Sequence, residues 1–536
     1  MIGSRMLRAV VPTFFAAPLD RLAAATRERI PRAVMRAVVP TFFAAAFAAT
    51  AFLGLAHAHA HADSSADMPV VEQHPTVSGD AGAESLEVGA SEQFIFNTFS
   101  FLILGALVMW MCAGFTMLES GAVRTKNASM ICLKNVGIYS IAGLAFFVIG
   151  YNIMYVDVGD VIGSFRFFYL PSSEEVALLE EGAELTTDVV DNGYSVMSDW
   201  FFQMVFVATT ASIVSGAIAG RVKLGPFFFF TLVLTAFIYP IVGAWTWGGG
   251  WLSEMGFVDF AGSTIVHGTG GWAALAGVLI IGPRLGKFRS DGTVKPTPPS
   301  NVLTVTLGVF ILWLGWFGFN GGSQLALGTP TDVIAMSNIF VNTNLAAAAG
   351  VIAALYVSRP LLGRVDLFAG LNGAIAGLVS ITAGPNITEL WLSIIIGAVG
   401  GVLCTLGIKL LEQFKLDDVV GAIPAHLISG IWGTLIASVA AGGRFHIQLL
   451  GVVSVGVFVF TVSAICWKLI DLVVGLRVSR QVEEIGQDAG ELGIESYPEF
   501  VLMPEDDYEI IKEGVEATSG SKSSKTKDTE TADTDS

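Results

Sequence analysis

Long apolar stretches separated by short polar ones occupy most of the chain from about residue 94 onward. About 20 consecutive apolar residues are enough to cross a bilayer as a helix. Eleven stretches approach or exceed this length, at 94–118, 130–155, 199–219, 226–246, 262–282, 301–320, 338–357, 366–383, 390–411, 423–441 and 448–475. The pattern therefore predicts an all-α polytopic membrane protein with eleven transmembrane helices.

The composition agrees with this pattern. Hydrophobic residues make up 53% of the chain, charged residues only 14%, and there are 60 glycines. Small residues let transmembrane helices approach closely, and these fractions exclude a soluble single-domain protein. Neither disulfide nor zinc spacing is visible in the four cysteines, which all lie in predicted spans: Cys112, Cys132, Cys404 and Cys466.

Lysine and arginine are divided unevenly between the two sets of connections. The set that follows the first, third, fifth, seventh, ninth and eleventh spans is basic, whereas the other set carries only Arg166 and Arg444. Because basic short loops stay in the cytoplasm, we predict an N-terminus outside and a C-terminus inside a plasma or inner membrane. The longest outer connection, 157–199, is expected to hold a short helix in its acidic stretch SSEEVALLEEGAEL.

The first 62 residues have the features of a secretory leader. Arg32 and Arg36 precede an apolar run, and Ala-x-Ala sites follow it in AHAHAHAD, a pattern typical of a signal peptide. We predict a mature chain that begins between His59 and Asp63. The sequence RAVVPTFFAA occurs at 8–17 and again at 36–45, which indicates either a duplicated leader or a true start at Met35.

Four segments follow from these patterns. Residues 1–62 are interpreted as the signal peptide, 63–92 as a polar outer segment, 93–478 as the eleven-helix membrane domain, and 479–536 as a cytoplasmic tail. The last twenty residues, rich in Ser, Thr and Lys, are expected to be disordered. No nucleotide-binding loop or catalytic triad spacing appears, so neither an enzyme nor a nucleic-acid partner is predicted.

His267 and His426 are the two histidines within the apolar stretches. An ionisable side chain inside a bilayer is costly and is a functional candidate by default. Spans one to five and spans six to ten form two groups of five. Because five is an odd number, the second group crosses the membrane in the opposite direction to the first. Transporter sites form near the midplane between inverted repeats. A lone buried histidine more often only hydrogen-bonds a carbonyl, but two at matching places in the two groups favour a functional pair.

The stretch 259–284, DFAGSTIVHGTGGWAALAGVLIIGPR, is similar from end to end to the signature of the Amt/Mep/Rh ammonium transporter family. Three further stretches carry the same resemblance: GFTMLESGAVRTKNA after the first span, GWFGFNGGS at 315–323, and DDVVGAIPAHLISGIWG at 417–433. The resemblance covers about residues 94–497. It implies the Amt branch, whose members have eleven spans.

This resemblance implies a homotrimer with one ammonium pore in each subunit and no cofactor or metal. His267 and His426 match two hydrogen-bonded imidazoles that line the pore. The family's outer vestibule, which recruits ammonium, and the phenylalanine pair that closes it are matched by four residues: Trp247, Ser323, Phe206 and Phe319. Methylammonium is a further expected substrate, and a PII-type signal protein is a candidate partner at the cytoplasmic face.

The chemistry of these residue types is consistent with that role. Aromatic faces attract a cation by roughly 0.5–2 kcal/mol each, and a hydroxyl oxygen accepts a hydrogen bond that ammonium can donate and potassium cannot. A bare cation would incur a large desolvation cost in an apolar pore. Ammonium is therefore expected to give up its proton and cross as ammonia. The imidazole pair would relay the proton, because each ring can accept at one nitrogen and donate at the other.

Several alternatives accompany this interpretation. Asp259 is interpreted as a structural cap for the fifth span rather than a cation ligand. Gly220 and Leu492 stand where the family usually carries glutamate and histidine, which weakens the expectation of PII-type regulation. An ammonium sensor that signals through the C-terminal tail is the main alternative function. A haem protein with two histidine ligands is another.

Overall fold

The computed structural model describes residues 83–180 and 186–498 of the chain. These residues belong to one unit, Thr76–Ser536. The predicted signal peptide and its cleavage site, most of the polar segment 63–92, and the last part of the tail lie outside the described residues.

Helices account for almost all regular structure. The first five spans are α3 (Ala83–Ala122), α4 to α5 (Ala128–Ala145 and Tyr151–Tyr155, joined by the π-helical η2, Phe146–Gly150), α8 (Val196–Ala217), α9 to α10 (Leu224–Val233 and Tyr239–Thr246, joined by η3, Leu234–Ile238), and η4 with α12 (Ser263–Gly268 and Thr269–Ile281). The next six are α13 (Val302–Gly322), α14 (Pro330–Leu362), α15 (Leu367–Ile381), α16 (Leu390–Gln413), η5 with α17 (Ile423–Ile428 and Ser429–Ala440), and α18 (Phe445–Val474).

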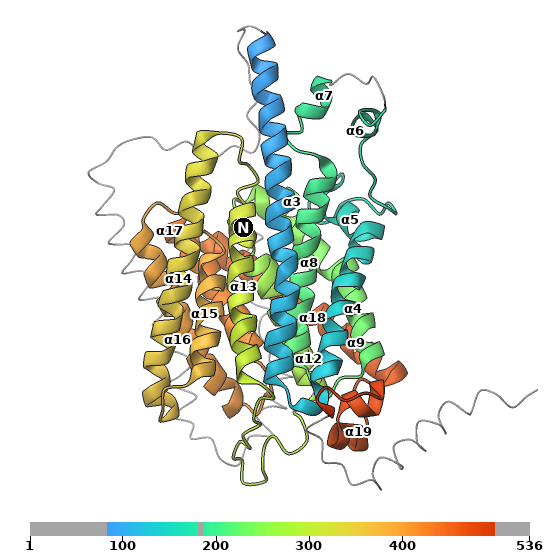
Figure 1. Cartoon of the computed structure of the whole chain (residues 1–536), viewed down its shortest axis with the longest axis vertical. Coiled ribbons are helices and arrows are strands. Elements are labelled where there is room, and N and C mark those ends of the chain that lie inside the picture. The colour runs from blue at the N-terminus through green and yellow to red at the C-terminus, as the bar shows by residue number, and fades with distance from the viewer. Residues whose placement is uncertain (1–82, 181–185, 499–536) are drawn as a thin grey trace, which may run out of the picture. The chain divides into compact units, whose positions relative to one another are not determined.

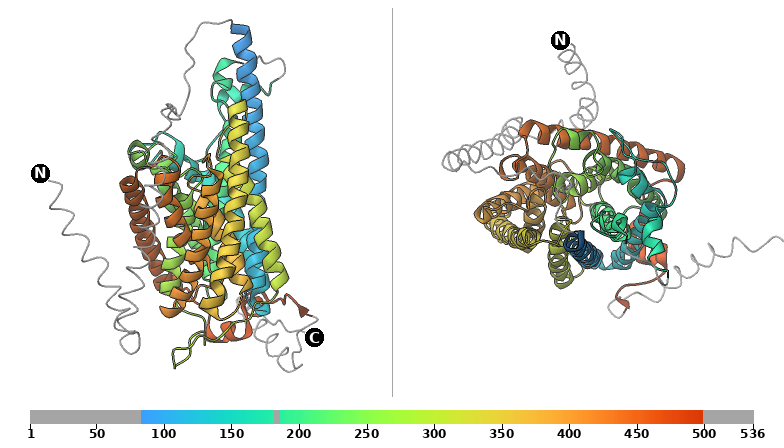
Figure 2. Two further views of the ribbon diagram at one scale, coloured as in Figure 1. Left: turned by 90° about the vertical axis from the view of Figure 1, so that its left-hand side faces the viewer. Right: turned by 90° about the horizontal axis from the view of Figure 1, so that it is seen from above.

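The predicted all-α fold is confirmed. Within the described ranges, ten helical stretches are long and apolar enough to cross a membrane, and α15 supplies a shorter apolar helix at the eighth position. No strand forms there beyond two isolated bridges, Val222 with Arg477 and Phe288 with Val294. The spans pack as a bundle of roughly parallel and antiparallel helices, with α18 running along its outside (Figure 2).

Glycines allow the closest helix contacts. At Gly308 in α13, a Cβ atom would lie 2.4 Å from the backbone nitrogen of Leu118 in α3. At Gly397 in α16, it would lie 2.0 Å from the carbonyl oxygen of Ala346 in α14. No side chain fits either place, so backbone packs directly on backbone, as in other membrane bundles.

The first helix is longer than the apolar pattern predicts. It begins at Ala83 rather than near residue 94, and it projects beyond its neighbours beside the short helices α6 (Ser173–Ala177) and α7 (Thr187–Val190) (Figure 1). The stretch AESLEVGASEQF is polar but rich in good helix formers, so α3 continues past its apolar part. The Asn97 side chain joins this part of α3 to two connections by hydrogen bonds. Its Nδ2 donates to the carbonyl of Gly193, and its Oδ1 accepts from the backbone N–H of Leu327.

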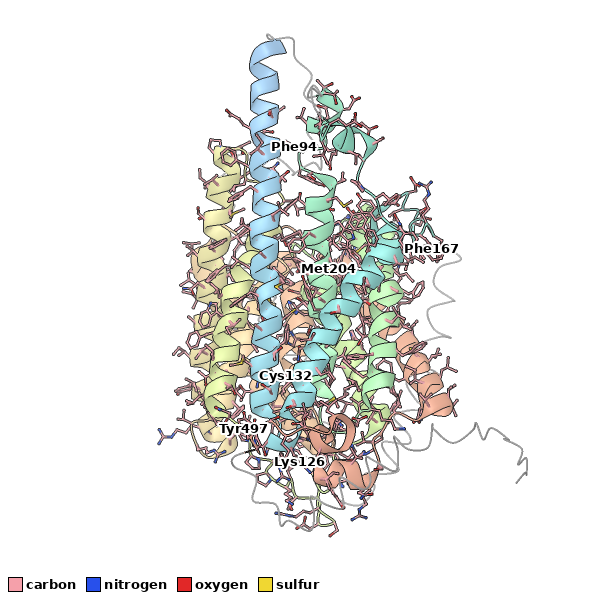
Figure 3. All side chains as sticks on the ribbon, turned by 45° about the vertical axis from the view of Figure 1, so that its right-hand side comes forward. Phe94, Lys126, Cys132, Phe167, Met204 and Tyr497 are labelled. Atoms are coloured by element: carbon pink, nitrogen blue, oxygen red, sulfur yellow. The ribbon has the colours of Figure 1, made fainter. Side chains whose placement is uncertain are left out.

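The short helix expected in the acidic part of the 157–199 connection is present as α6, with Ser172 as its cap. In Figure 3, Phe94 and Phe167 lie toward this end of the helices, whereas Lys126 and Tyr497 lie at the opposite end. The connections predicted to be outside and those predicted to be cytoplasmic thus occupy opposite ends of the bundle.

The beginning of the tail packs on the end that carries Lys126. Helix α19 (Arg480–Ile485) and the π-helical turn η6 (Asp488–Leu492) lie below α4 (Figure 1). The carboxylate of Asp488 accepts hydrogen bonds from the backbone of Ser129 (2.9 Å) and Met130 (2.7 Å), and thereby caps α4. The Lys126 ammonium donates to the carbonyl of Glu483 at 2.7 Å. This part of the tail is therefore ordered by specific contacts.

Candidate functional site

The fifth and tenth spans begin with the same local structure. Each starts with a π-helical turn, η4 or η5, that carries a histidine. Such turns occur frequently at functional sites. In each case an aspartate stands eight positions before that histidine, Asp259 before His267 and Asp418 before His426.

The two aspartates satisfy backbone donors at the start of these spans. Asp259 accepts from the N–H groups of Gly262, Ser263, Thr264 and Ile265 at 2.7–3.2 Å. Asp418 accepts from Gly421 and Ile423 at 3.1 and 2.7 Å. Burial raises the pKa of the Asp259 carboxyl to about 6, and its four backbone hydrogen bonds limit that rise. Both carboxylates are engaged as caps for the segment that holds each histidine.

The structure brings the two histidines into direct contact. The Nδ1 atoms of His267 and His426 are 3.1 Å apart, and the rings are inclined by 26°. Both side chains are buried, at 0% and 3% exposure. One Nδ1 must donate and the other accept, so the two neutral rings are opposite tautomers. The pair therefore presents one protonated and one bare Nε2 at its two ends.

Close backbone contact positions this pair. At Gly430 in α17, a Cβ atom would lie 2.4 Å from the carbonyl oxygen of Ser263 in η4. At Gly271 in α12, it would lie 2.6 Å from the Cβ of Leu427 in η5. Larger residues at either place would separate the two π-helical turns and stretch the hydrogen bond between the imidazoles.

Aromatic rings lead from the pair toward one end of the bundle. The Phe319 ring stacks on His267 (5.3 Å between centroids) and on Phe206 (4.1 Å). The Phe206 ring then meets Trp247 edge to face at 6.0 Å. Phe206 and Phe319 are fully buried, whereas Trp247 is half-buried. The rings thus form a continuous series from a partly exposed tryptophan to the histidines.

The remaining predicted site residues lie near this series. Trp247 is held by a hydrogen bond from its Nε1 to the carbonyl of Asp259 (2.9 Å). Half-buried Ser323, at the end of α13, donates from its Oγ to the carbonyl of Phe319 at 2.9 Å. Because the hydroxyl proton is used there, the oxygen lone pairs of Ser323 remain available to accept a hydrogen bond.

Three residues of the site were not singled out from the sequence. The Trp316 ring stacks on His267 at 4.9 Å, and Phe202 packs on Phe206 at 4.9 Å. Asp418 is the third. Trp316 and Asp418 lie within stretches already noted, and the spacing that Asp418 shares with Asp259 was readable by comparing the fifth and tenth spans. Phe202 carries no signal in a chain with 37 phenylalanines.

The two departures from the family pattern lie on the Lys126 side of the bundle. Gly220 has a φ of +75°, and a Cβ there would lie 3.1 Å from Nδ2 of Asn127. A left-handed backbone favours glycine over glutamate at this turn. Leu492 is half-buried at the end of η6.

The two imidazoles lie at hydrogen-bonding distance, with their Nδ1 atoms 3.1 Å apart. Within the described residues, no group of three or more His, Cys, Asp or Glu side chains is placed to hold a metal. The contact between the imidazoles is a hydrogen bond.

Comparison with known proteins gives a consistent result. The model of the Ammonium Transporter Family matches residues 99–497. Ammonium transporter Amt2 of Archaeoglobus fulgidus is 38% identical over 445 residues, which cover 77% of this chain and 90% of that relative.

Solved structures are similar as well. A structure described as Sensor Amt Protein superposes with a TM-score of 0.68 at 34% identity, covering 74% of this chain and 98% of that one. Mep2 of Candida albicans superposes with a TM-score of 0.62 at 27% identity, covering 74% of this chain and 89% of that one.

Proposed function

Because the chain belongs to the ammonium transporter family, we propose that it carries ammonium across a membrane through a pore within its own helical bundle. The observation that carries this proposal is the hydrogen bond between His267 and His426, buried in the bundle at the end of a series of aromatic rings. Ionisable side chains within membrane spans are costly and usually mark a pathway for ions or protons.

Ammonium is first recruited at the half-buried end of this series. The ring faces of Trp247 and Phe206 attract a cation, and the Ser323 oxygen accepts one of its N–H groups. The stacked pair Phe206 and Phe319 then closes the route to any hydrated ion. A cation that passed these rings would lose its water without gaining a charged partner, so it gives up its proton instead.

Ammonia then moves along the apolar path beside the histidines. The proton follows through the imidazole pair: one ring accepts it at Nε2 and passes a proton through the Nδ1 contact, and the second ring releases one at its own Nε2. The two fluxes together amount to net transport of ammonium. Asp259 takes no part as a ligand in this scheme, because four backbone N–H groups already occupy its oxygens.

The same proposal includes the surroundings of the pore. The end that carries Trp247 faces outside, and the end that carries Lys126 and the tail faces the cytoplasm, as the basic connections predict. The transport unit covers about residues 93–478 and assembles as a homotrimer with one pore per subunit. A PII-type protein is a candidate regulator at the cytoplasmic face, where Gly220 and Leu492 depart from the usual pattern.

Sensing of ammonium is the second candidate function. The observation that favours it is the similarity to the structure described as Sensor Amt Protein. A sensor would use the same aromatic and histidine site but would report its occupancy through the tail. Transport distinguishes the two functions, because only a transporter must deliver ammonium to the cell.

The test uses cells that lack their own ammonium transporters. We expect the full chain to restore their growth on limiting ammonium, and the purified protein in proteoliposomes to give an ammonium-evoked current on a supported membrane. Expression in the membrane without growth rescue or current would contradict the transport function and leave sensing as the better explanation.

A further inference from the structure

Glu119 is a buried carboxylate that the mechanism above does not use. It lies in the last turn of α3 at 1% exposure. Its Oε2 accepts a hydrogen bond from the Ser215 hydroxyl in α8 at 2.7 Å. Its Oε1 has no hydrogen-bond partner among the described residues. A carboxylate kept within a span is costly, and such groups usually mark a pathway for ions or protons.

Glu119 and His426 line the same cavity. The other side chains around it include Ser212, Ile213, Asn372 and Ala425. Most of these walls are apolar, so the hydroxyl, the amide, the carboxylate and the imidazole are the groups that can bind water there. Glu119 and His426, the histidine of the pair that does not contact Phe319, thus line one space.

Glycine keeps this space open. At Gly216 in α8, a Cβ atom would lie 2.7 Å from the Cγ2 of Val420 and 3.5 Å from the Cδ of Glu119. A side chain at this position would clash with Val420 and contact Glu119, so its absence leaves room between these two residues.

A buried cation stands near the carboxylate. The Lys134 ammonium in α4 donates to the carbonyl of Ser215 at 3.1 Å and lies 4.3 Å from the centre of the Phe227 ring. Ser215 therefore contacts both charged groups, the carboxylate through its hydroxyl and the ammonium through its carbonyl. The opposite charges offset part of the cost of burying each other.

Glu119 also lies on the side of the histidine pair that is proposed to face the cytoplasm. Helix α3 ends at Ala122, and Lys126 follows in the short helix η1 (Thr125–Asn127). Glu119 is one turn from that end, which Figure 3 shows opposite to Phe167. It stands between the histidine pair and the end proposed to face the cytoplasm.

From this geometry we propose that Glu119 receives the proton that leaves the histidine pair on the inner side. The N–H bond at Nε2 of His426 breaks, a proton crosses through water in the shared cavity, and an O–H bond forms at Oε1. Glu119 becomes a neutral carboxylic acid and then returns to a carboxylate by releasing the proton to solvent at the cytoplasmic end. This role rests on the proposed transport function.

The test compares two fluxes in proteoliposomes. Ammonium chloride pulses on a supported membrane measure the current, and an internal pH dye in stopped flow measures entry of ammonia. Glu119→Gln keeps the size of the side chain but cannot accept the proton. We expect its current to fall at least about tenfold while ammonia entry stays within about twofold of the wild type. Glu119→Asp, which remains titratable, is expected to restore much of the current.

Two variants complete the test. Glu254→Gln removes an exposed carboxylate at the other end of the bundle and is expected to change neither flux. Ser212→Val adds bulk to the cavity wall and leaves Glu119 in place. It is expected to lower the current, because the proton crosses this cavity, and to leave the entry of ammonia unchanged. It also provides the decisive result should Glu119→Gln fail to assemble.

The outcomes separate this role from the transport function itself. A folded Glu119→Gln protein with full current would overturn the proposal, as would one in which current and ammonia entry fall together, because the residue would then be structural. Full current in Ser212→Val would overturn it as well. A wild-type protein without any ammonium-evoked current would instead contradict the transport function on which the proposal rests.

Discussion

At the scale of single residues, the Nδ1 contact between His267 and His426 determines what the pore can carry. Each ring uses one nitrogen for its partner and keeps the other for the pathway. We therefore predict that His426→Ala lowers the ammonium-evoked current at least about tenfold, because the relay loses one of its two rings. Currents of the variant and the wild type on a supported membrane check this.

The matched control is His446→Ala, which removes an exposed histidine at the start of α18. Its current should equal that of the wild type. If His426→Ala protein of normal size and stability carried undiminished and equally selective current, both imidazoles would have to be regarded as packing residues.

Trp247 allows a second prediction at this scale. Loss of its ring in Trp247→Leu removes roughly 0.5–2 kcal/mol of cation attraction, which corresponds to about a 2- to 30-fold higher ammonium concentration for half-maximal current. Methylammonium should compete less well in the same assay. Trp391→Leu, which changes an exposed tryptophan on α16, serves as control. Equal half-maximal concentrations for both variants would exclude Trp247 from the recruiting site.

The sequence anticipated these residues to different degrees. His267 and His426 are recognisable from hydropathy alone, because histidine is rare in long apolar stretches. Phe206 and Phe319 are recognisable only through the resemblance, because stacking at 4.1 Å depends on how α8 and α13 cross. Phe202 and Trp316 were missed for the same reason: an aromatic residue on an apolar helix looks alike whether it faces lipid, core or pore.

At the scale of helices, the two π-helical turns are the elements that hold the histidines. A widened turn leaves more backbone groups without regular partners, and Asp259 compensates at η4 with four accepted hydrogen bonds. The apolar pattern located both spans but not these turns, because a π-helical turn has no distinct hydrophobic period. It also missed the first part of α3, which is helical without being apolar.

Removal of this cap should therefore affect stability and transport together. Asp259→Ala leaves several buried N–H groups unpaired, each costing about 1–3 kcal/mol, and lets His267 move away from its partner. We expect a clearly lower melting temperature in detergent and a reduced current. Asp188→Ala, which removes an exposed aspartate of helix α7, controls for loss of an aspartate. A melting temperature equal to that of the control would show that the backbone of η4 does not depend on the carboxylate.

At the scale of the whole molecule, ionic contacts at the Lys126 end join the two groups of spans to each other and the last span to the tail. Arg284, after the fifth span, donates to Asp417, before the tenth, at 2.8 Å from both Nε and Nη2. Arg477, after the last span, forms an ion pair with Glu483 of α19 at 2.8 Å. Arg284 and Asp417 are 133 residues apart in the sequence. Hydropathy therefore predicts that both lie on the same side of the membrane, but it does not predict that they form an ion pair.

The pair of Arg284 and Asp417 supports the last prediction. Its carboxylate is fully buried, and although burial alone would raise the pKa of Asp417, the hydrogen bonds and charge of Arg284 hold that pKa well below its usual range. Removing one partner of a buried ion pair typically costs about 3–5 kcal/mol, so Asp417→Asn should melt at a markedly lower temperature. Glu484→Gln, which breaks an exposed pair with Arg480, should change the melting temperature little.

The pH dependence gives an independent check on that interpretation. A carboxyl whose pKa is depressed by folding contributes its stability at every pH above the unfolded value, about 3.9 for aspartate, and loses that contribution only as the pH falls toward the lower folded pKa. The difference in melting temperature between wild type and Asp417→Asn should therefore stay constant from pH 8 to about pH 5 and shrink in stronger acid. A difference that vanished already near neutral pH would mean that the ion pair does not hold the two groups of spans together.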